Sequence, residues 1–307
     1  ATRQCSMKVI EALNNLIPNL VGGSADLSGS NNTKTSNSTI ISSKNYGGNY
    51  LHFGVREHGM AAAMNGMALY HNLIPYGGTF LIFSDYCKPA IRLSALMGLR
   101  VIYIFSHDSI GLGEDGPTHQ PIEHLSSLRA IPNLNVFRPA DMNETLECWE
   151  ASLNNEKGPS AIILSRQKLN YISKFPDKKN KCLMGAYEIN ISGHDNKVTL
   201  IASGSEVELA LSTQEMLKES GIESKVVSMP CQELFDKQSE EYRNKILESE
   251  NLIVSLEAGS VCCWYKYLKK NDIAIGIDKF GKSAPYKEIF EEMNLTSNKI
   301  VSIIQKN

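Results

Sequence analysis

The sequence predicts an α/β protein with two domains, each a mostly parallel sheet flanked by helices. Short apolar runs alternate with longer amphipathic segments along the whole chain, which is typical of strand–helix units. The 307 residues leave room for about two domains of ordinary size. The composition becomes polar and charged at 171–182, which we interpret as a linker between a domain at 1–170 and a domain at 183–307.

The first half is expected to begin with a helix. Apolar residues recur at helical spacing from Cys5 to Leu16, Thr2 is suited to cap the helix, and Pro18 stops it. A second helix is predicted at 57–70, where alanine and methionine dominate. The remaining predicted elements are strands at 101–105, 136–137 and 161–164, a helix at 144–153, and a Ser/Asn-rich surface loop at 28–43.

The second half repeats the alternation. A strand at 198–202 is followed by a turn at Gly204-Ser205 and a helix at 206–219. Three more strands are expected at 225–228, 252–256 and 273–277.

Composition and charge exclude several classes of protein. The formal net charge is −2 with a pI of about 6.4, and no basic stripe indicates binding to nucleic acid or to an anionic membrane. The longest apolar runs are too short to cross a bilayer. Seven cysteines, an odd number without a CxxC pair, argue against a disulfide framework or a zinc site and favour a reducing, cytoplasmic location. The chain starts with Ala-Thr-Arg and has no signal-peptide pattern, so we expect sequence upstream of it.

The segment His107 to Pro121 carries the densest set of reactive side chains. It reads His-Asp-Ser-Ile-Gly-Leu-Gly-Glu-Asp-Gly-Pro-Thr-His-Gln-Pro and directly follows the predicted strand at 101–105. The carboxyl ends of parallel strands are where α/β proteins bind ligands, and glycines let the backbone approach a ligand closely. Its two histidines and its acidic side chains supply proton donors and acceptors near neutral pH. From spacing alone, a solvated glycine-rich surface loop is an equally good interpretation.

This segment resembles the signature of the transketolase family. Four further motifs occur in the family's order, at 22–27, 54–60, 164–167 and 204–208, and the resemblance runs along the whole chain. It implies a thiamine-diphosphate-dependent transferase of the pentose phosphate pathway. Such an enzyme moves a two-carbon ketol unit reversibly from xylulose 5-phosphate to ribose 5-phosphate or erythrose 4-phosphate. The resemblance also implies a homodimer formed through the pyrimidine-binding domains.

The resemblance implies the cofactor-binding residues as well. Glu57 matches the glutamate that hydrogen-bonds N1′ of the thiamine pyrimidine, so that the exocyclic nitrogen can take the thiazolium proton. A carboxylate at a helix start is, by itself, only a favourable charge–dipole pair. Phe80, Phe83 and Tyr86 match an aromatic pocket around that pyrimidine. Their spacing of three is also typical of an ordinary buried helix face.

Six residues match family positions along the sugar-phosphate channel: Arg3, Ser30, His107, Asp115, His119 and Arg166. Guanidinium groups and hydroxyls suit a phosphate dianion. The resemblance assigns the donor's C1 region to His107, the acceptor's C2 hydroxyl to Asp115 and proton relay to His119, so the catalytic set is Glu57, His107 and His119. The family usually has proline where this chain has Gly29, which predicts a looser Ser30 loop.

A diphosphate-binding motif is not found in these residues. In the family, a Gly-Asp-Gly segment of the N-terminal domain holds the diphosphate and its Mg²⁺ or Ca²⁺, and no Gly-Asp-Gly occurs here. We therefore predict no metal ligands in this chain. We expect an N-terminal diphosphate-binding domain as its partner, whether cut off, disordered or a separate subunit, and little activity from the isolated chain.

Related activities remain as alternatives. The loop of 1-deoxyxylulose-5-phosphate synthase lacks the Gln120-Pro121 ending, and β subunits of 2-oxoacid dehydrogenases share the layout but not the motif at 114–119. Dihydroxyacetone synthase shares the motifs closely and is not separated from transketolase by these residues. A non-catalytic dimerisation fragment is a further alternative, against which the intact Glu57, His107 and His119 argue.

Overall fold

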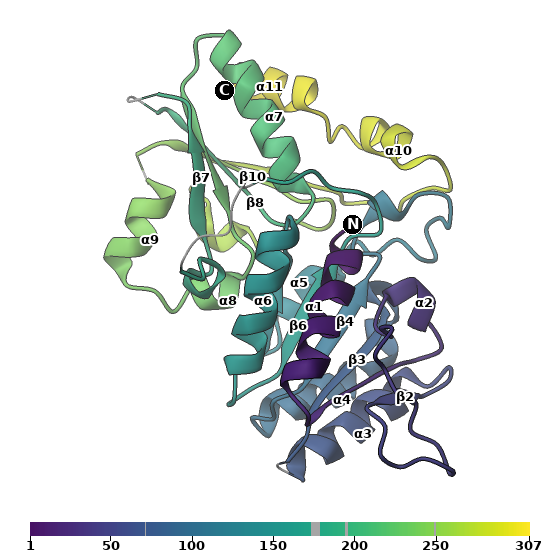
Figure 1. Cartoon of the computed structure of the whole chain (residues 1–307). Coiled ribbons are helices and arrows are strands. Elements are labelled where there is room, and N and C mark those ends of the chain that lie inside the picture. Colours follow the sequence, from purple (N-terminus) through teal and green to yellow (C-terminus); the bar gives the residue numbers. More distant parts are fainter. Residues whose placement is uncertain (71, 173–178, 194–195, 249) are drawn as a thin grey trace.

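The chain contains two α/β units, and each has one central sheet covered by helices on both faces (Figure 1). The structure is a computed structural model that describes residues 1–70, 72–172, 179–193, 196–248 and 250–307. The first half, purple to teal in Figure 1, and the second half, green to yellow, form two adjoining lobes. The predicted fold class is confirmed.

The first half contains a parallel sheet. Its strands are β1 (Leu20–Ser24), β2 (Tyr50–His52), β3 (Ile74–Phe80), β4 (Ile102–Ser106), β5 (Asn135–Phe137) and β6 (Ser160–Leu164). Its helices are α1 (Thr2–Leu16), α2 (Ser28–Asn31), α3 (Glu57–Leu69), α4 (Ser84–Leu96), α5 (His124–Arg129) and α6 (Met142–Asn154), with 3-10 turns η1 (Leu81–Phe83) and η2 (Ile110–Leu112). Within the described residues the strand order is β2-β1-β3-β4-β6-β5, and every neighbouring pair is parallel.

The side chains of strand β4 are buried on both faces of the sheet. Ile102 and Ile104 point to the face covered by α1 and α6, whereas Tyr103 and Phe105 point to the face covered by α3, α4 and α5. A strand alternates its side chains between the two faces, so a sheet covered on both faces needs apolar residues at every position. Burial on both faces fixes β4 in the centre of the sheet, with its carboxyl end leading into the segment that starts at His107.

The second half contains a mixed sheet. Its strands are β7 (Tyr187–Ile191), β8 (Val198–Ala202), β9 (Ser224–Ser228), β10 (Leu252–Leu256) and β11 (Ile273–Ile275). Its helices are α7 (Glu206–Glu219), α8 (Gln232–Phe235), α9 (Glu240–Leu247), α10 (Tyr286–Glu292) and α11 (Ser297–Ile304), with 3-10 turns η3 (Cys182–Met184) and η4 (Tyr265–Tyr267). The order is β11-β10-β8-β9-β7, and only the edge strand β7 runs antiparallel among the described strands.

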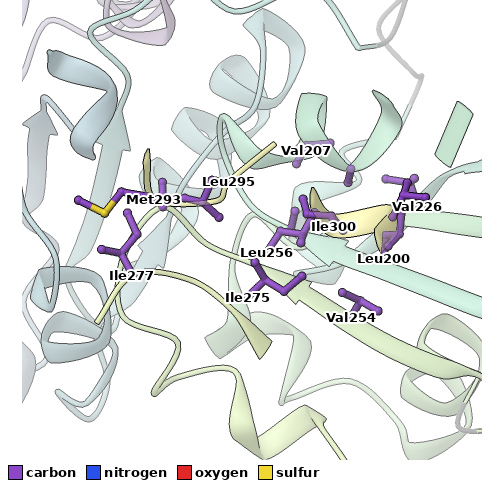
Figure 2. Packing of buried hydrophobic residues seen from close by; sticks show 14 of the residues in the cluster. Leu200, Val207, Val226, Val254, Leu256, Ile275, Ile277, Met293, Leu295 and Ile300 are labelled. Atoms are coloured by element: carbon purple, nitrogen blue, oxygen red, sulfur yellow. The ribbon is translucent and has the colours of Figure 1, made fainter. Parts of the chain in front are cut away.

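The core of the second sheet lies between its strands and the helices α7 and α11. Figure 2 shows Leu200, Val226 and Leu256 from the strands beside Val207 of α7 and Ile300 of α11. These side chains are fully buried. The predicted strands at 198–202 and 252–256 and the predicted helix at 206–219 are confirmed to the residue.

Several local predictions are wrong. Ala1 occupies the cap position of α1, and the hydroxyl of Thr2 instead accepts a hydrogen bond from the Ser165 amide. The expected surface loop at 28–43 contains helix α2 and the buried Thr33. The strand expected at 273–277 ends at Ile275. The predicted linker at 171–182 falls partly on 173–178, outside the described residues, so the domain bounds stay a prediction.

No helix in the described part of the chain is long and apolar enough to cross a membrane.

Candidate functional site

Aromatic rings gather where strands β3 and β4 end. Phe80 is the last residue of β3, and its ring stacks on His107, the residue after β4, with ring centroids 3.7 Å apart. Phe83 in η1 stacks on Phe80 at 5.7 Å, and Tyr86 in the first turn of α4 stacks on Phe83 at 5.9 Å. The three predicted aromatic residues therefore form one continuous stack, because strand, turn and helix follow each other without a gap.

The glycine-rich segment returns to the same aromatic stack. His119 contacts Phe83 edge-on at 5.6 Å and Phe80 at 6.2 Å between ring centroids. The Nδ1 atom of His119 lies 2.9 Å from the Thr118 hydroxyl. Both predicted histidines of the segment thus lie against the Phe80 ring, and His119 also contacts Phe83.

A groove of about 460 Å³ opens beside Phe83 and Tyr86. Glu57, the first residue of α3, lies half-buried in its wall. The groove is lined by Ala25, Asp26, Leu27, Val55, Glu57, Phe83 and Tyr86. Four of these residues were not among the predicted site residues. For Ala25, Asp26 and Leu27 the signal is the motif at 22–27, which covers the carboxyl end of β1 and the turn after it, whereas Val55 lies in the motif at 54–60.

The turn after β1 brings a second carboxylate to the groove. Asp26 has a left-handed backbone with φ 61°, which is uncommon for a residue other than glycine. It follows Ala25, whose amide donates a hydrogen bond to the Gly78 carbonyl in β3. The groove therefore has apolar and aromatic walls with carboxylates of Asp26 and Glu57 in its lining, which fits a flat heterocycle with polar edge atoms.

A separate group of side chains has the composition of a metal site. Asp85, Glu123 and His124 form the one such group within the described ranges, and both carboxylates are exposed. The Nε2 atom of His124 already lies 3.0 Å from an Asp85 oxygen. None of the three residues lines the groove.

Arg3 and Ser30, two of the predicted sugar-phosphate residues, are in direct contact. The Nη1 atom of Arg3 donates a hydrogen bond of 2.5 Å to the Ser30 carbonyl oxygen, which links the first turn of α1 to α2. Arg166 is exposed just beyond β6. Asp115 is also exposed, and neither Asp115 nor Arg166 forms a side-chain hydrogen bond to another described residue.

His107 has an unusual environment. Burial, followed by the positive charges of Arg3 and Arg166, lowers the pKa of its ring to about 3. Its Nδ1 atom lies 2.9 Å from the Ser106 hydroxyl, which leaves Nε2 for a ligand. The expectation that both histidines exchange protons near neutral pH therefore does not hold for His107, which stays neutral there.

Comparisons with known proteins agree with this geometry. The family described as "Transketolase, pyrimidine binding domain" matches residues 1–171, and "Transketolase-like TK C-terminal domain" matches residues 185–296. A transketolase of Sinorhizobium medicae is 50% identical over 303 residues, which is 98% of this chain and 44% of that protein. A Pichia stipitis transketolase solved with sedoheptulose-7-phosphate has a TM-score of 0.95 and 39% identity, and it matches 100% of this chain and 45% of its own.

A further solved structure has about the same length as this chain. A chain described as a split gene transketolase, inactive beta4 tetramer, has a TM-score of 0.79 and 23% identity, and the match covers 97% of that chain, which shows a shared fold. This chain spans about 45% of the length of the curated relatives and solved enzymes that it matches more strongly.

The two family models match the halves of the chain that hold the two sheets, as a pyrimidine-binding domain and a C-terminal domain of the kind found in thiamine-diphosphate-dependent proteins. The family match covers more than half of the chain and the relatives extend it to nearly all of it. The chain belongs to the transketolase family.

Proposed function

We propose that this chain forms the pyrimidine half of the cofactor site and most of the sugar-phosphate site of a transketolase. The reaction is the reversible transfer of a two-carbon ketol unit from xylulose 5-phosphate to ribose 5-phosphate or erythrose 4-phosphate. The observation that carries the proposal is the groove that Glu57 lines together with the stacked rings of Phe83 and Tyr86. We also propose domains at 1–170 and 183–307 and a cytoplasmic location.

Glu57, Phe83 and Tyr86 would hold the pyrimidine ring of thiamine diphosphate. The aromatic wall supports stacking on a flat heterocycle, and the Glu57 carboxylate would hold a proton on the ring nitrogen that it faces. When bound, the cofactor supplies the nucleophilic carbon that accepts the two-carbon unit. Closure of the groove against a partner would exclude water from this carboxylate and strengthen its interaction with the ring.

The sugar phosphate would bind along the line from His107 to Arg3 and Arg166. The two guanidinium groups supply charge for the phosphate, and their influence on the His107 pKa supports a common surface. Neutral His107 would direct Nε2 at the donor's C1 oxygen as a hydrogen-bonding group. His119 would move the proton as the carbon–carbon bond breaks, and exposed Asp115 would contact the acceptor's C2 hydroxyl.

Two partners complete the proposed site. A diphosphate-binding domain with its Mg²⁺ or Ca²⁺ would supply the other half of the cofactor site. A second copy of this chain would cover the outer faces of α3 and α4, where large apolar side chains are 44% to 71% exposed. These side chains are Leu69, Tyr70, Leu93, Leu96 and Met97.

Glu57→Gln tests the proposed cofactor role in the complete enzyme that contains this chain. Glutamine keeps the shape but loses the charge, and a charge-assisted hydrogen bond contributes about 1.5–3 kcal/mol. We expect turnover to fall by about tenfold to a few hundredfold. The measurement is hydrogen–deuterium exchange at the thiazolium C2 of bound cofactor. Unchanged exchange in the variant would show that the Glu57 assignment is wrong.

Arg166→Ala separates the phosphate role from the cofactor role. Because Arg166 would bind the phosphate equally in the ground and transition states, the variant should raise KM for phosphorylated sugars more than it lowers kcat. Steady-state kinetics with a phosphorylated and an unphosphorylated donor measure this split. An equal loss with both donors would count against a phosphate contact.

A further inference from the structure

Arg138 is a fully buried cation between the two sheets. It follows β5, and its guanidinium reaches residues from both halves of the chain. One Asp108 oxygen accepts hydrogen bonds from Nε at 3.1 Å and from Nη2 at 2.8 Å. Nη1 donates to Glu257 at 2.6 Å, to the Ser203 carbonyl at 2.9 Å, and also to Glu206.

In this cluster three carboxylates contact one guanidinium, and all four side chains are buried. Glu206 begins α7 and Glu257 follows β10, so two of the acids belong to the second half, while Asp108 belongs to the first. Burial raises the pKa of Asp108 and that of Glu257, the latter to about 7, despite the neighbouring Arg138. Acids exceed cations here, so removal of one carboxylate does not leave Arg138 buried without a partner.

Asp108 is the residue directly after His107. The His107 backbone is left-handed, with φ 61°, a conformation that costs a residue with a side chain on the order of 1 kcal/mol. Such a conformation persists where neighbouring contacts fix the chain on both sides. Before His107, the ladder of β4 with β3 and β6 fixes the backbone at Ser106. After it, the fixed point is the paired hydrogen bond from Arg138 to Asp108.

The far end of the glycine-rich segment is also held by the second half. The Gln120 amide donates to the Gly113 carbonyl at 2.9 Å and to the Lys282 carbonyl at 2.8 Å. The Ser283 hydroxyl donates a hydrogen bond to the Glu114 carbonyl. The segment that carries His107, Asp115 and His119 is thus tied to the second half near both of its ends.

We propose that Arg138 is a positioning residue through which the second half of the chain holds Asp108, and thereby His107, in the conformation that the candidate site requires. This inference rests on the proposed function for the role of His107 and assigns to the C-terminal sheet a task in that site. Arg138 itself contacts neither the groove nor the aromatic stack.

Asp108→Ala tests the proposal on the 307-residue chain. The readouts are amide hydrogen exchange of the segment 106–112 and the ring signals of His107 in histidine-labelled protein, assigned with His107→Asn. We expect exchange in this segment to become at least about tenfold faster and the His107 ring signals to shift, because a charged paired hydrogen bond is lost. Glu206→Gln, which weakens the hold of the second half on Arg138, should change the same two readouts in the same direction.

Glu233→Ala is the matched control. Arg129 donates to both Glu233 oxygens, at 3.1 and 3.2 Å, so this ion pair also joins the two halves but does not contact the glycine-rich segment. We expect it to leave exchange at 106–112 within about twofold of the parent. The proposal is overturned if Asp108→Ala leaves that exchange unchanged or if the control raises it equally. If Asp108→Ala does not fold, the Glu206→Gln result alone decides in the same way. Neither readout needs cofactor, so the result is independent of the test of the proposed function.

Discussion

The ring of His107 lies against Phe80, and its Nδ1 atom lies within hydrogen-bond distance of the Ser106 hydroxyl, while burial and the positive charges of Arg3 and Arg166 lower its pKa. The motif that begins with His107 predicts it as a candidate site residue. Its protonation state could not be predicted, because Phe80, Arg3 and Arg166 come from three distant stretches of sequence. A neutral ring near two guanidinium groups adds no further positive charge to the proposed phosphate site.

The lowered pKa of His107 makes stability depend on pH in a defined direction. In the unfolded chain His107 is protonated below its ordinary pKa of 6.5, whereas in the folded chain its lowered pKa keeps it neutral down to about pH 3. The unfolded state therefore binds more protons in this window, and this contribution to stability is lost as the pH falls from 6.5 toward 3.

His107→Asn removes the titration and keeps a residue that tolerates a left-handed backbone. When the pH is lowered from about 7 to about 5.5, the parent should lose about 1 kcal/mol more of its free energy of unfolding than the variant does. Urea unfolding at both pH values measures the difference. A constant difference between the two proteins would mean that His107 is protonated normally in the folded chain.

At the scale of single elements, the apolar strands were predictable and the glycine-rich ones were not. Strands β4, β6, β8 and β10 are mostly apolar and buried on both faces, and β9 has the apolar pair Val226-Val227 at its centre. Strand β1 reads Leu-Val-Gly-Gly-Ser and β3 contains Pro75 and two glycines, so neither has a local strand pattern. Their glycines make room for side chains from elsewhere, which only the packed structure shows. The same holds for the groove, whose Asp26 and Val55 come from turns.

Gly22→Ala tests this close approach in β1. A β-carbon at Gly22 would lie 1.8 Å from the ring of Tyr76, a buried residue whose hydroxyl donates to the Thr33 carbonyl at 3.1 Å. We expect a loss of about 1–3 kcal/mol or more in the free energy of unfolding. Gly29→Ala is the matched control, since nothing lies within 4 Å of its position in α2. The control should change stability by no more than about 1 kcal/mol in the same urea titration. Equal losses would contradict the packing explanation.

At the scale of the whole molecule, the two sheets are joined by buried polar contacts. Beside Arg138 and the Arg129–Glu233 pair, the Glu144 carboxylate accepts hydrogen bonds from Ser228 at 2.5 Å and from Tyr187 at 2.7 Å. Separation of the halves would leave these groups without partners. The sequence predicted two units but not this connection, because each partner comes from a different half of the chain.

The chain is therefore expected to unfold as one cooperative unit. Its two tryptophans lie one in each half, Trp149 in α6 and Trp264 beside η4, and both are fully buried. Trp149→Phe leaves a reporter in the second half, and Trp264→Phe leaves one in the first. In each variant, the urea midpoints from fluorescence and from far-UV circular dichroism should coincide. A fluorescence midpoint that departs from the dichroism midpoint in either variant would indicate that the halves unfold separately.

The groove beside Glu57 is open, and its wall residues Val55 and Tyr86 are 75% and 64% exposed. A ligand that touches only this wall keeps much of its surface in water, so most of its binding energy has to come from the surface that closes over it. Occupancy of the groove then follows mass action in the protein as well as in the ligand. Dilution of the protein would empty such a site even at a constant excess of thiamine diphosphate. Bound cofactor would in turn stabilise the association of this chain with its proposed partner.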